Sequence, residues 1–379
     1  MKRNTHLIRF SVFIIIFSFI CLSFLHAQKI KVKTEDGVQV VYNPKQPAPP
    51  PGTPKKLILT PDLIIGEEEA GDFVFVEIRT IQVDEEENIY VLDPREICVK
   101  IFDKNGKCLR TFGKKGQGPG EWQNPWQMYL KAEKEIMIFD STNRRLSYYS
   151  LDGKCLKEIS IGAHTFLRTI PDSKGNIIAE VPVRGEKRVY EIKKFDPKLN
   201  PVVTVATIED EKISNVINLA SPVLAIRVMS NDCIAWSFPS KYELFVVNPE
   251  GKTIRKIVKE YDPVKITEAE KEEIIKRNFG APGVPPLPPG FKIEFPENYP
   301  AFYYFVCDDE GRTYVRTYEK DEKGNFCYDV FDPEGRYITK LFLPENELIQ
   351  VIKKNKMHIV IRENEEGIPI VKRYNMEWR

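Results

Sequence analysis

Along most of the chain, hydrophobic and polar residues alternate in short runs that end at Asp, Asn, Pro or Gly. One arrangement recurs, in which an alternating strand leads into an Asp or Asn turn with Gly and then into a second strand. Such runs of β-branched and aromatic residues around a tight turn predict β-hairpins. The copies are VKIFDKNGKCLRTF (99–112), YYSLDGKCLKEISI (148–161), a degenerate IKKFDPKLNPVVTV (192–205), LFVVNPEGKTIRKIV (244–258) and YDVFDPEGRYITKLF (328–342).

A second predicted hairpin precedes each of these, so that the repeating unit has four strands, here called a to d. Gly106 and Gly153 lie 47 residues apart, which is the length of one four-stranded propeller blade. The first hairpins are IRTIQVDEEENIYVLD (78–93), QMYLKAEKEIMIFD (127–140), LRTIPDSKGNIIAEV (167–181), AIRVMSNDCIAWSF (225–238), YYFVCDDEGRTYVRTY (303–318) and LIQVIKKNKMHIVIREN (348–364).

Five units are complete, and the sixth ends after a third strand, IPIVKRYNMEW (368–378). The extended apolar segment KKLILTPDLIIGEEE (55–69) is a candidate for the missing outer strand. Pairing of the two ends would close the ring and remove exposed sheet edges. We therefore predict an all-β fold over 55–379, a six-bladed β-propeller of four-stranded antiparallel blades that is closed by an N-terminal strand.

The segment VDEEENIYVLDPREICVKIFDKNGKCLRTFGKKGQGPGEWQNPW (83–126) resembles the NHL repeat. It has an Asp turn, an Asp at a strand end, a strand ending in Phe-Asp and a Gly-rich crossover after Phe-Gly. DSTNRRLSYYSLDGKCL (140–156) is similar to the Asp…Asn-x-Arg part of that repeat, with Asp140, Asn143 and Arg145 in place. The resemblance implies a six-bladed, NHL-like propeller of the type that bacteria export. It is strong over two blades and weaker beyond them.

The N-terminus predicts export. Lys2, Arg3 and Arg9 precede the apolar run FSVFIIIFSFICLSFL (10–25), and Ala27 is a plausible cleavage point. A basic region, a short apolar region and a small residue are typical of a signal peptide, here 1–27. The run is short for a membrane span of about 20 residues, and an uncleaved anchor is the alternative. We expect a periplasmic or extracellular protein, with 28–54 as an N-terminal extension and Pro-rich linker.

Charge and cysteine content exclude several classes of function. Without residues 1–27 the chain has 53 basic and 55 acidic residues, which are mixed along the sequence. Nucleic acid is therefore not an expected partner, no membrane span is expected after cleavage, and we expect a monomer. Six cysteines without CxxC pairs do not predict a zinc site. We expect free thiols, although export leaves disulfides open, at Cys98, Cys108, Cys155, Cys233, Cys307 and Cys327.

An insertion over 262–299 separates the fourth and fifth units, where Gly251 and Gly335 lie 84 residues apart. ITEAEKEEIIKRNFG (266–280) predicts a short helix with Thr267 before its first turn and Gly280 at its end. A proline-rich stretch, 281–300, follows. The insertion lies in a crossover from strand d to the next strand a, on the same face of a propeller as the b–c loops. We expect a lid or a partner-binding arm there.

Catalytic signatures are sparse. His164 and His358 are the histidines beyond the leader, which is too few for a three-histidine zinc site, and no G-x-S-x-G or H-E-x-x-H motif occurs. A calcium site of the lactonase kind would need carboxylates and Asn at the inner ends of several blades. Asp93, Asp140 and Asn143 are weak candidates, although they are also ordinary turn residues of the repeat. We expect no cofactor, with calcium as the open possibility.

The stretch FGKKGQGPGEW (112–122) is glycine-rich but does not predict a phosphate loop, because Gly-Lys-Ser/Thr is absent and Pro119 removes a donor. We interpret it as the crossover from blade 1 to blade 2. Arginines and aromatic residues are frequent anchors of interfaces, and on the crossover and b–c loop face we expect them at Trp122, Trp126, Arg95, Arg144, Arg145, Arg184, Tyr242, Arg316 and Tyr318. The alternative for each is that the aromatic ring wedges between blades and that the arginine is solvated. The favoured function is a non-enzymatic scaffold that binds a protein, peptide or glycan of the cell envelope. The alternative is a calcium-dependent lactonase- or lyase-like enzyme with its site in the central channel.

Overall fold

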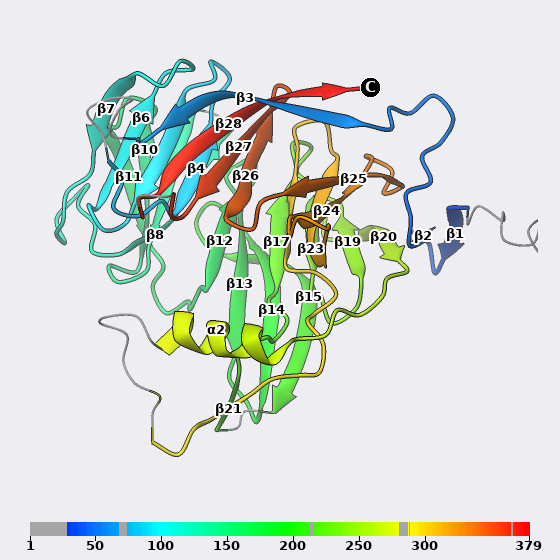
Figure 1. Ribbon diagram of the computed structural model, residues 1–379. Helices are drawn as coiled ribbons and strands as arrows, with labels where there is room; N and C mark the ends of the chain where they lie inside the picture. The colour runs from blue at the N-terminus through cyan, green and yellow to red at the C-terminus, as the bar shows by residue number, and fades with distance from the viewer. Residues whose placement is uncertain are drawn as a thin grey trace, which may run out of the picture.

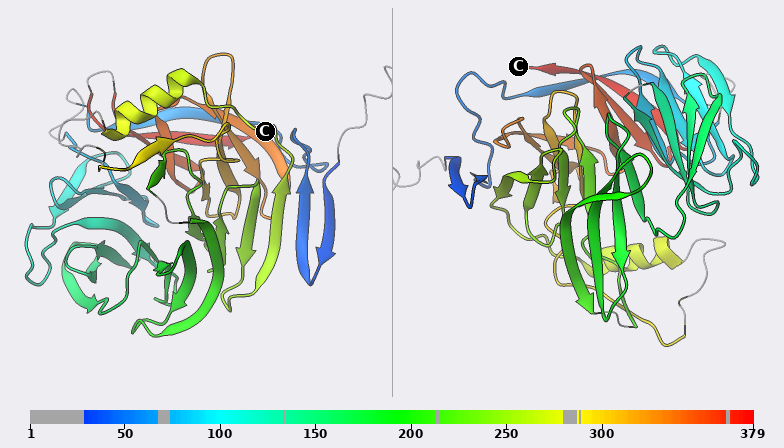
Figure 2. Two further views of the ribbon diagram at one scale, coloured as in Figure 1. Left: turned by 90° about the horizontal axis from the view of Figure 1, so that it is seen from below. Right: turned by 180° about the vertical axis from the view of Figure 1, so that it is seen from behind.

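The structure, a computed structural model, describes residues 29–67, 74–132, 134–212, 215–279, 287, 289–364 and 367–379. The predicted signal peptide lies outside these ranges. Six blades, each of four antiparallel strands, form a ring (Figure 1), and Figure 2 gives two further views of it. The predicted six-bladed propeller is confirmed.

The first three blades follow one another along the chain. Blade 1 consists of β4 (Thr80–Val83), β5 (Ile89–Asp93), β6 (Cys98–Phe102) and β7 (Cys108–Phe112). Blade 2 consists of β8 (Pro125–Lys131), β9 (Glu135–Asp140), β10 (Arg145–Ser150) and β11 (Cys155–Ser160). Blade 3 consists of β12 (Arg168–Pro171), β13 (Ile177–Val183), β14 (Lys187–Phe195) and β15 (Pro201–Lys212).

The other three blades include the insertion and the closing strand. Blade 4 contains β17 (Ala225–Val228), β18 (Ile234–Ser237), β19 (Glu243–Val247) and β20 (Thr253–Lys259). Blade 5 contains β22 (Tyr304–Cys307), β23 (Thr313–Lys320), β24 (Phe326–Phe331) and β25 (Tyr337–Leu343). Blade 6 contains β26 (Glu347–Lys353), β27 (Lys356–Ile361), β28 (Ile370–Trp378) and, from the other end of the chain, β3 (Leu57–Ile65).

Local chemistry explains the hairpins. In the turn after β6, the Asp103 carboxylate accepts hydrogen bonds from the backbone N–H groups of Asn105 and Lys107. Gly106 follows with a φ of 86°, a conformation that glycine adopts without strain. Asp172 makes the same bonds in blade 3, and Asp332 makes them in blade 5. The Asp-x-x-Gly pattern in the sequence therefore specifies the turn by side chain-to-backbone hydrogen bonds.

Ring closure occurs as predicted. β3 pairs antiparallel with β28 from Leu57 opposite Trp378 to Ile65 opposite Val371, and Figure 1 shows the two strands side by side near the C-terminus. Val360 and Val371 of blade 6 pack with Ile81 and other residues of blade 1. Each of the six hydrophobic clusters found among the described residues joins two neighbouring blades. The core is thus a closed series of blade interfaces.

An N-terminal hairpin, which the sequence analysis missed, enlarges blade 4. β1 (Lys31–Glu35) and β2 (Val38–Asn43) form the hairpin, and β2 runs parallel to β20. The Asn43 side chain accepts a hydrogen bond from Tyr337 N at 2.8 Å and donates one to Gly335 O at 3.0 Å. Residues assigned to an extension and linker therefore cover the outer edge of blade 4 and contact blade 5.

The insertion lies across one face of the ring. It contains α2 (Glu268–Phe279) and β21 (Lys292–Glu294), and β21 pairs in parallel with β16 (Val216–Asn218) from the crossover between blades 3 and 4. The left view of Figure 2 looks onto this face, with α2 lying across the blades. The predicted helix after Thr267 is confirmed, while Gly280 lies outside the described residues. No helix within the described ranges is long and apolar enough to cross a membrane.

Candidate functional site

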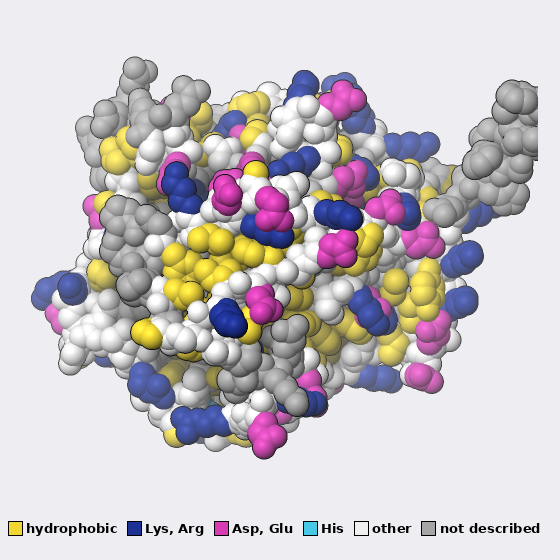
Figure 3. All heavy atoms as spheres, turned by 60° about the horizontal axis from the view of Figure 1, so that its bottom comes forward, with side chains coloured by type: hydrophobic (Ala, Val, Ile, Leu, Met, Phe, Trp, Pro, Cys, Tyr) yellow, Lys and Arg dark blue, Asp and Glu magenta, His cyan; other side chains and the backbone are white. Residues whose placement is uncertain are grey.

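A pocket of about 730 Å³ opens on the face that carries α2. Three crossovers and two b–c loops contribute to it, so the predicted gathering of these loops on one face is found in the structure. Its walls include segments 219–223, 299–303 and 345–348, together with residues of α2 and of the b–c regions of blades 5 and 6. Figure 3 looks at this side of the molecule and shows hydrophobic side chains near its middle, with Lys, Arg, Asp and Glu around them.

The first turn of α2 is bonded to blade 5, and this holds the helix beside the pocket. Thr267 Oγ1 accepts a hydrogen bond from Glu270 N at 3.3 Å, and Thr267 N donates to Glu270 Oε2 at 3.0 Å, which together form a capping box. Glu270 Oε1 lies 3.5 Å from Lys320 Nζ in blade 5. Burial raises the pKa of Glu270, but the bonds from Thr267 and the charge of Lys320 outweigh it and lower this pKa overall. The same carboxylate thus begins the helix and fixes it to the ring.

Tyrosine rings form one wall of the pocket. Tyr299, at the end of the insertion, stacks on Tyr318 with 4.1 Å between ring centroids and 9° between planes. Tyr303 stands at a steep angle to Tyr318 and is 41% exposed. Burial raises the pKa of Tyr299 to about 12, so its hydroxyl stays protonated at neutral pH. Flat, accessible aromatic faces of this kind can stack on planar or ring-shaped ligands.

Arg316, on β23, occupies the base of this wall. Its guanidinium lies 4.1 Å from the Phe326 ring centroid and 5.3 Å from that of Tyr303, and the side chain is only 6% exposed. Nη2 donates to Glu345 O at 3.2 Å, whereas the buried Nε has no hydrogen-bond partner. Of the residues expected at the binding face, Arg316 and Tyr318 are the two that line this pocket.

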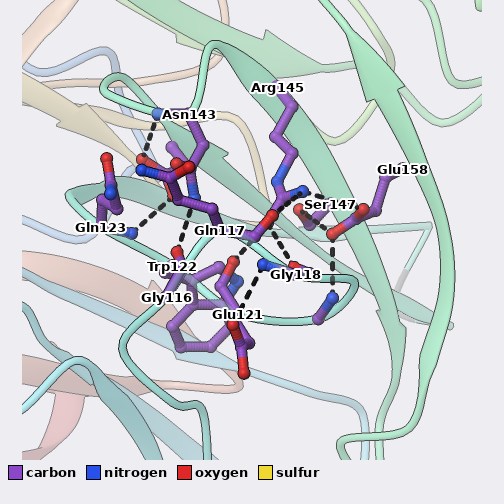
Figure 4. Close-up of polar contacts among 12 residues, drawn as sticks. Gly116, Gln117, Gly118, Glu121, Trp122, Gln123, Asn143, Arg145, Ser147 and Glu158 are labelled. Atoms are coloured by element: carbon purple, nitrogen blue, oxygen red, sulfur yellow. Dashed lines mark hydrogen bonds and ion pairs between the residues drawn. The ribbon is translucent and has the colours of Figure 1, made fainter.

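The first crossover, residues 113–124, has a different role. Figure 4 shows Arg145 and Glu158 beside the glycine-rich loop. Arg145 donates to the carbonyl oxygens of Gln117, Gly118 and Glu121, and it forms an ion pair with Glu158 at 3.1 Å. Asn143 Nδ2 donates to Gly116 O at 3.0 Å. The Asn-x-Arg part of the repeat therefore fixes the backbone of the crossover.

Trp122 lies in this crossover but does not reach the surface. Its side chain is fully buried, with the Phe112 ring at 5.7 Å and the Tyr149 ring at 5.4 Å. Nε1 donates to Tyr149 Oη at 2.8 Å. Its proposed role as a partner contact is therefore wrong, because the indole wedges between blades 1 and 2. Trp126 is 39% exposed, and its ring is covered by Arg79 at 4.3 Å.

The other expected contact residues are dispersed. Arg95 is exposed and pairs with Glu77 at 3.2 Å. Arg144 donates to Gly162 O and His164 O, and Arg184 is exposed in the loop between β13 and β14. Tyr242 is a second correction, since it is buried and donates to Asp329 Oδ2 at 2.6 Å. None of these four lines the pocket.

The weak calcium candidates act as turn residues. Asp93 accepts hydrogen bonds from the backbone N–H groups of Val76, Glu77, Arg95 and Glu96. Asp140 accepts equivalent bonds from Gln123, Asn124, Thr142 and Asn143. Both carboxylates join a crossover to a b–c loop, and both are buried. No cluster of three or more His, Cys, Asp or Glu side chains suited to a metal ion occurs among the described residues.

Neither histidine lies in a catalytic arrangement. His164 stacks on Phe166 with 5.3 Å between ring centroids. His358 is buried, both its ring nitrogens lack hydrogen-bond partners, and burial together with Arg373 and Lys356 lowers its pKa to about 3. The six cysteines beyond the leader are free, as expected, and burial raises the pKa of Cys98 to about 12. Burial also raises the pKa of Cys233 and Cys327, so these three buried thiols have the character of packed apolar groups rather than nucleophiles.

Sequence reasoning missed two groups near the site. Tyr299 and Tyr303 stand at the end of the proline-rich stretch. The sequence signal that could have identified them is their position as aromatic residues just before an inner strand. Arg168 and Arg227 lie on neighbouring inner strands, β12 and β17, and donate to the carbonyl oxygens of Leu224 and Ile226. Burial and the nearby Arg168 lower the pKa of Arg227. Basic residues on inner strands thus bring positive charge into the ring.

Comparisons with known proteins agree with this architecture. The family DUF5128, described as a 6-bladed beta-propeller, matches residues 68–223. No curated protein matches the chain in sequence. Among solved structures, a Bacteroides fragilis protein named as exported aligns with a TM-score of 0.55 at 11% identity, covering 89% of this chain and 99% of its own. A DUF4221 member from Bacteroides vulgatus has a TM-score of 0.53 at 11% identity, covering 86% and 99%. At these identities the likeness concerns the fold alone.

Proposed function

We propose that this chain is an exported, non-enzymatic propeller that binds an extended partner, a peptide or glycan, in the pocket beneath α2. The observation that carries the proposal is a pocket of about 730 Å³, built from loops on a rigid ring and lined by the exposed ring of Tyr303. Ligand pockets commonly have volumes of roughly 300–1,000 Å³. Export is supported by the basic and apolar leader, and by the likeness to a protein named as exported. The NHL type of the repeat is part of the same proposal.

The insertion acts as a wall of the site in this proposal. Glu273, Ile274 and Arg277 of α2 line the pocket, and the capping box and Lys320 hold the helix in position. The lactonase-like alternative would need metal ligands other than Asp93 and Asp140, because the oxygens of both already accept backbone hydrogen bonds.

Binding to peptide and glycan arrays tests the proposal. Tyr303→Ala is expected to weaken the signal of the retained ligand more than about tenfold, because it removes an exposed stacking face. Trp126→Ala is the matched control, since Trp126 is equally exposed but lies outside the pocket. Equal ligand binding by the Tyr303→Ala variant and the wild-type protein would show that the pocket is not the binding site.

A further inference from the structure

Arg316 differs from the other buried cations in lacking a counter-ion. Six Lys and Arg residues are buried in the part of the chain that the structure describes, and five of them pair with a carboxylate. The pairs are Lys100 with Glu96, Lys194 with Asp172, Lys259 with Asp329, Lys353 with Glu85 and Arg373 with Asp62. Arg316 has the backbone oxygen of Glu345 and two aromatic rings instead.

An unpaired buried charge is costly, because desolvation is not offset by an opposite charge. The Phe326 and Tyr303 rings beside the guanidinium offset part of this cost but give its N–H groups no hydrogen-bond acceptor. Nε is buried and has no hydrogen-bond partner, and the residue lines the pocket. A carboxylate on the ligand would supply the missing charge and could accept hydrogen bonds from the guanidinium of this pocket-lining residue.

Further positive charge lies next to Arg316. Tyr304, on the inner strand of blade 5, bonds to Tyr328 through its hydroxyl at 2.9 Å. Burial raises the pKa of Tyr304, while the charges of Arg316 and Arg227 both oppose this rise. Tyr304 lies opposite Arg316 in the register of β22 and β23, and the Arg227 guanidinium lies 5.7 Å from the ring centroid of the adjacent Phe305. Positive charge on neighbouring inner strands therefore favours an anionic group near Arg316.

Apart from Arg316, the charges that line the pocket leave no surplus of positive charge. Glu270, Glu273, Glu345 and Glu363 line it together with Arg277, Lys320 and Arg362, and Lys320 pairs with Glu270. Additional acidic groups on a ligand would therefore meet no net positive charge there, whereas hydroxyl groups could donate to the carboxylates. The chemistry that fits is one carboxylate near Arg316, a ring that stacks on tyrosine, and an uncharged body rich in hydroxyl groups.

We infer that Arg316 binds the carboxylate of a single uronic acid residue in an otherwise neutral oligosaccharide, with its sugar ring against Tyr303. This inference rests on the proposed binding function and specifies its ligand. An acidic peptide or a polyuronate fits less well, because each brings several negative charges to a pocket whose lining, apart from Arg316, has four carboxylates and three cations.

Calorimetric titration with glucuronosyl-xylotriose tests the inference. Its matched ligands are the same saccharide with the carboxylate reduced to an alcohol, and trigalacturonate. The wild-type protein is expected to bind the acid at least ~30-fold more tightly than the reduced form, in line with the loss of a desolvated charge pair. Trigalacturonate should bind more weakly than glucuronosyl-xylotriose. The Arg316→Leu variant should lose the preference for the acid.

Arg95→Leu is the control variant, since it removes the same charge from an exposed arginine that lies outside the pocket. It should bind as the wild-type protein does. The Tm of Arg316→Leu without ligand should equal or exceed the wild-type value. A clear fall in that Tm would make Arg316 a structural residue and overturn the inference.

The remaining outcomes separate the inference from the proposed function. If the reduced saccharide binds as tightly as the acid, or if Arg316→Leu binds the acid normally, the uronate inference is overturned and the pocket remains a binding site. If no saccharide binds while array peptides bind in a Tyr303-dependent manner, the inference is likewise overturned. The proposed function itself is contradicted if the Tyr303→Ala variant binds the ligand as tightly as the wild-type protein does.

Discussion

Two crossovers on the same face of the ring have opposite characters. The crossover from blade 1 to blade 2 is closed, because Arg145 binds its carbonyl oxygens and Trp122 fills the space between the blades. The crossover from blade 4 to blade 5 carries α2 and ends at Tyr299 and Tyr303, which border a pocket. Arginine and aromatic side chains lie at both crossovers. The comparison teaches that such side chains stay available to a ligand only where the crossover backbone and the blade interface do not already use them.

The largest expected loss of stability comes from a substitution in the closed crossover, between blades 1 and 2. Trp122→Ala should lower the free energy of unfolding by about 4 kcal/mol, because it leaves a cavity between two blades. Denaturant-induced unfolding followed by circular dichroism would measure the change. Trp126→Ala should alter stability by less than about 1 kcal/mol, since that ring is partly exposed. Similar losses for the two variants would contradict the contrast between a buried and a surface tryptophan.

Paired and unpaired buried arginines should respond differently. Asp62→Asn leaves Arg373 without its carboxylate and should destabilise the protein by about 3 kcal/mol, since an uncompensated charge then remains buried. Arg316→Leu should change the free energy of unfolding by less than about 1 kcal/mol, because no ion pair is lost. Chemical denaturation of both variants tests this. A loss in Arg316→Leu as large as that in Asp62→Asn would show that Arg316 is structural.

Glycine-to-alanine substitutions test how crowded the backbone is in each of the two crossovers. A Cβ at Gly113, where φ is 117°, would lie 2.4 Å from the Trp122 ring and 2.6 Å from Ile97 O. Gly113→Ala should therefore destabilise by about 2–3 kcal/mol or more, through left-handed strain and overpacking. Gly290, in the insertion, also has a positive φ but has open space around it. Gly290→Ala should cost about 1 kcal/mol, as judged from thermal unfolding, and equal losses would argue against crowding at Gly113.

The smallest effect concerns the pH dependence of α2. The folded protein lowers the pKa of Glu270. This carboxylate therefore stabilises the folded protein at pH values above its ordinary pKa of about 4.3, and the stabilisation is lost as the pH falls through the lowered pKa. Hydrogen exchange should show α2 opening as the pH drops below about 4. Thr267→Ala removes the cap oxygen and should loosen the helix at neutral pH by about 1 kcal/mol. Unchanged exchange in both experiments would contradict the role of the cap.

Much of the fold could be predicted because its signals are local. The Asp-x-x-Gly turns specify hairpins through hydrogen bonds within a few residues, as at Asp103 and Asp332. The count of units then required a closing strand, and β3 provides it. The position of α2 followed from Thr267 and Glu270. The hairpin of β1 and β2 gave no comparable signal, because its place beside β20 depends on partners such as Gly335 and Tyr337, nearly 300 positions away.

The candidate site was only partly predictable. Arg316 and Tyr318 were recognised as belonging to the face, but so were Trp122 and Tyr242, which do not line the pocket. Both pairs were predicted from residue type and from a place on the crossover and b–c loop face. The difference arises from neighbours that are distant in sequence, such as Tyr149 beside Trp122 and Asp329 beside Tyr242. Exposure is a property of these contacts and not of the residue alone.

The sequence by itself determined the hairpins of the blades, the number of blades, the closure of the ring and the face on which the insertion lies. These features depend on turn chemistry and on alternation, which act over short distances along the chain. Only the tertiary structure decided which arginines are neutralised. Arg145 meets Glu158, Arg373 meets Asp62, and Arg316 meets no carboxylate among the described residues. The physical reason is that ion pairing requires proximity in space, and the folding of six blades into one ring is what sets that proximity.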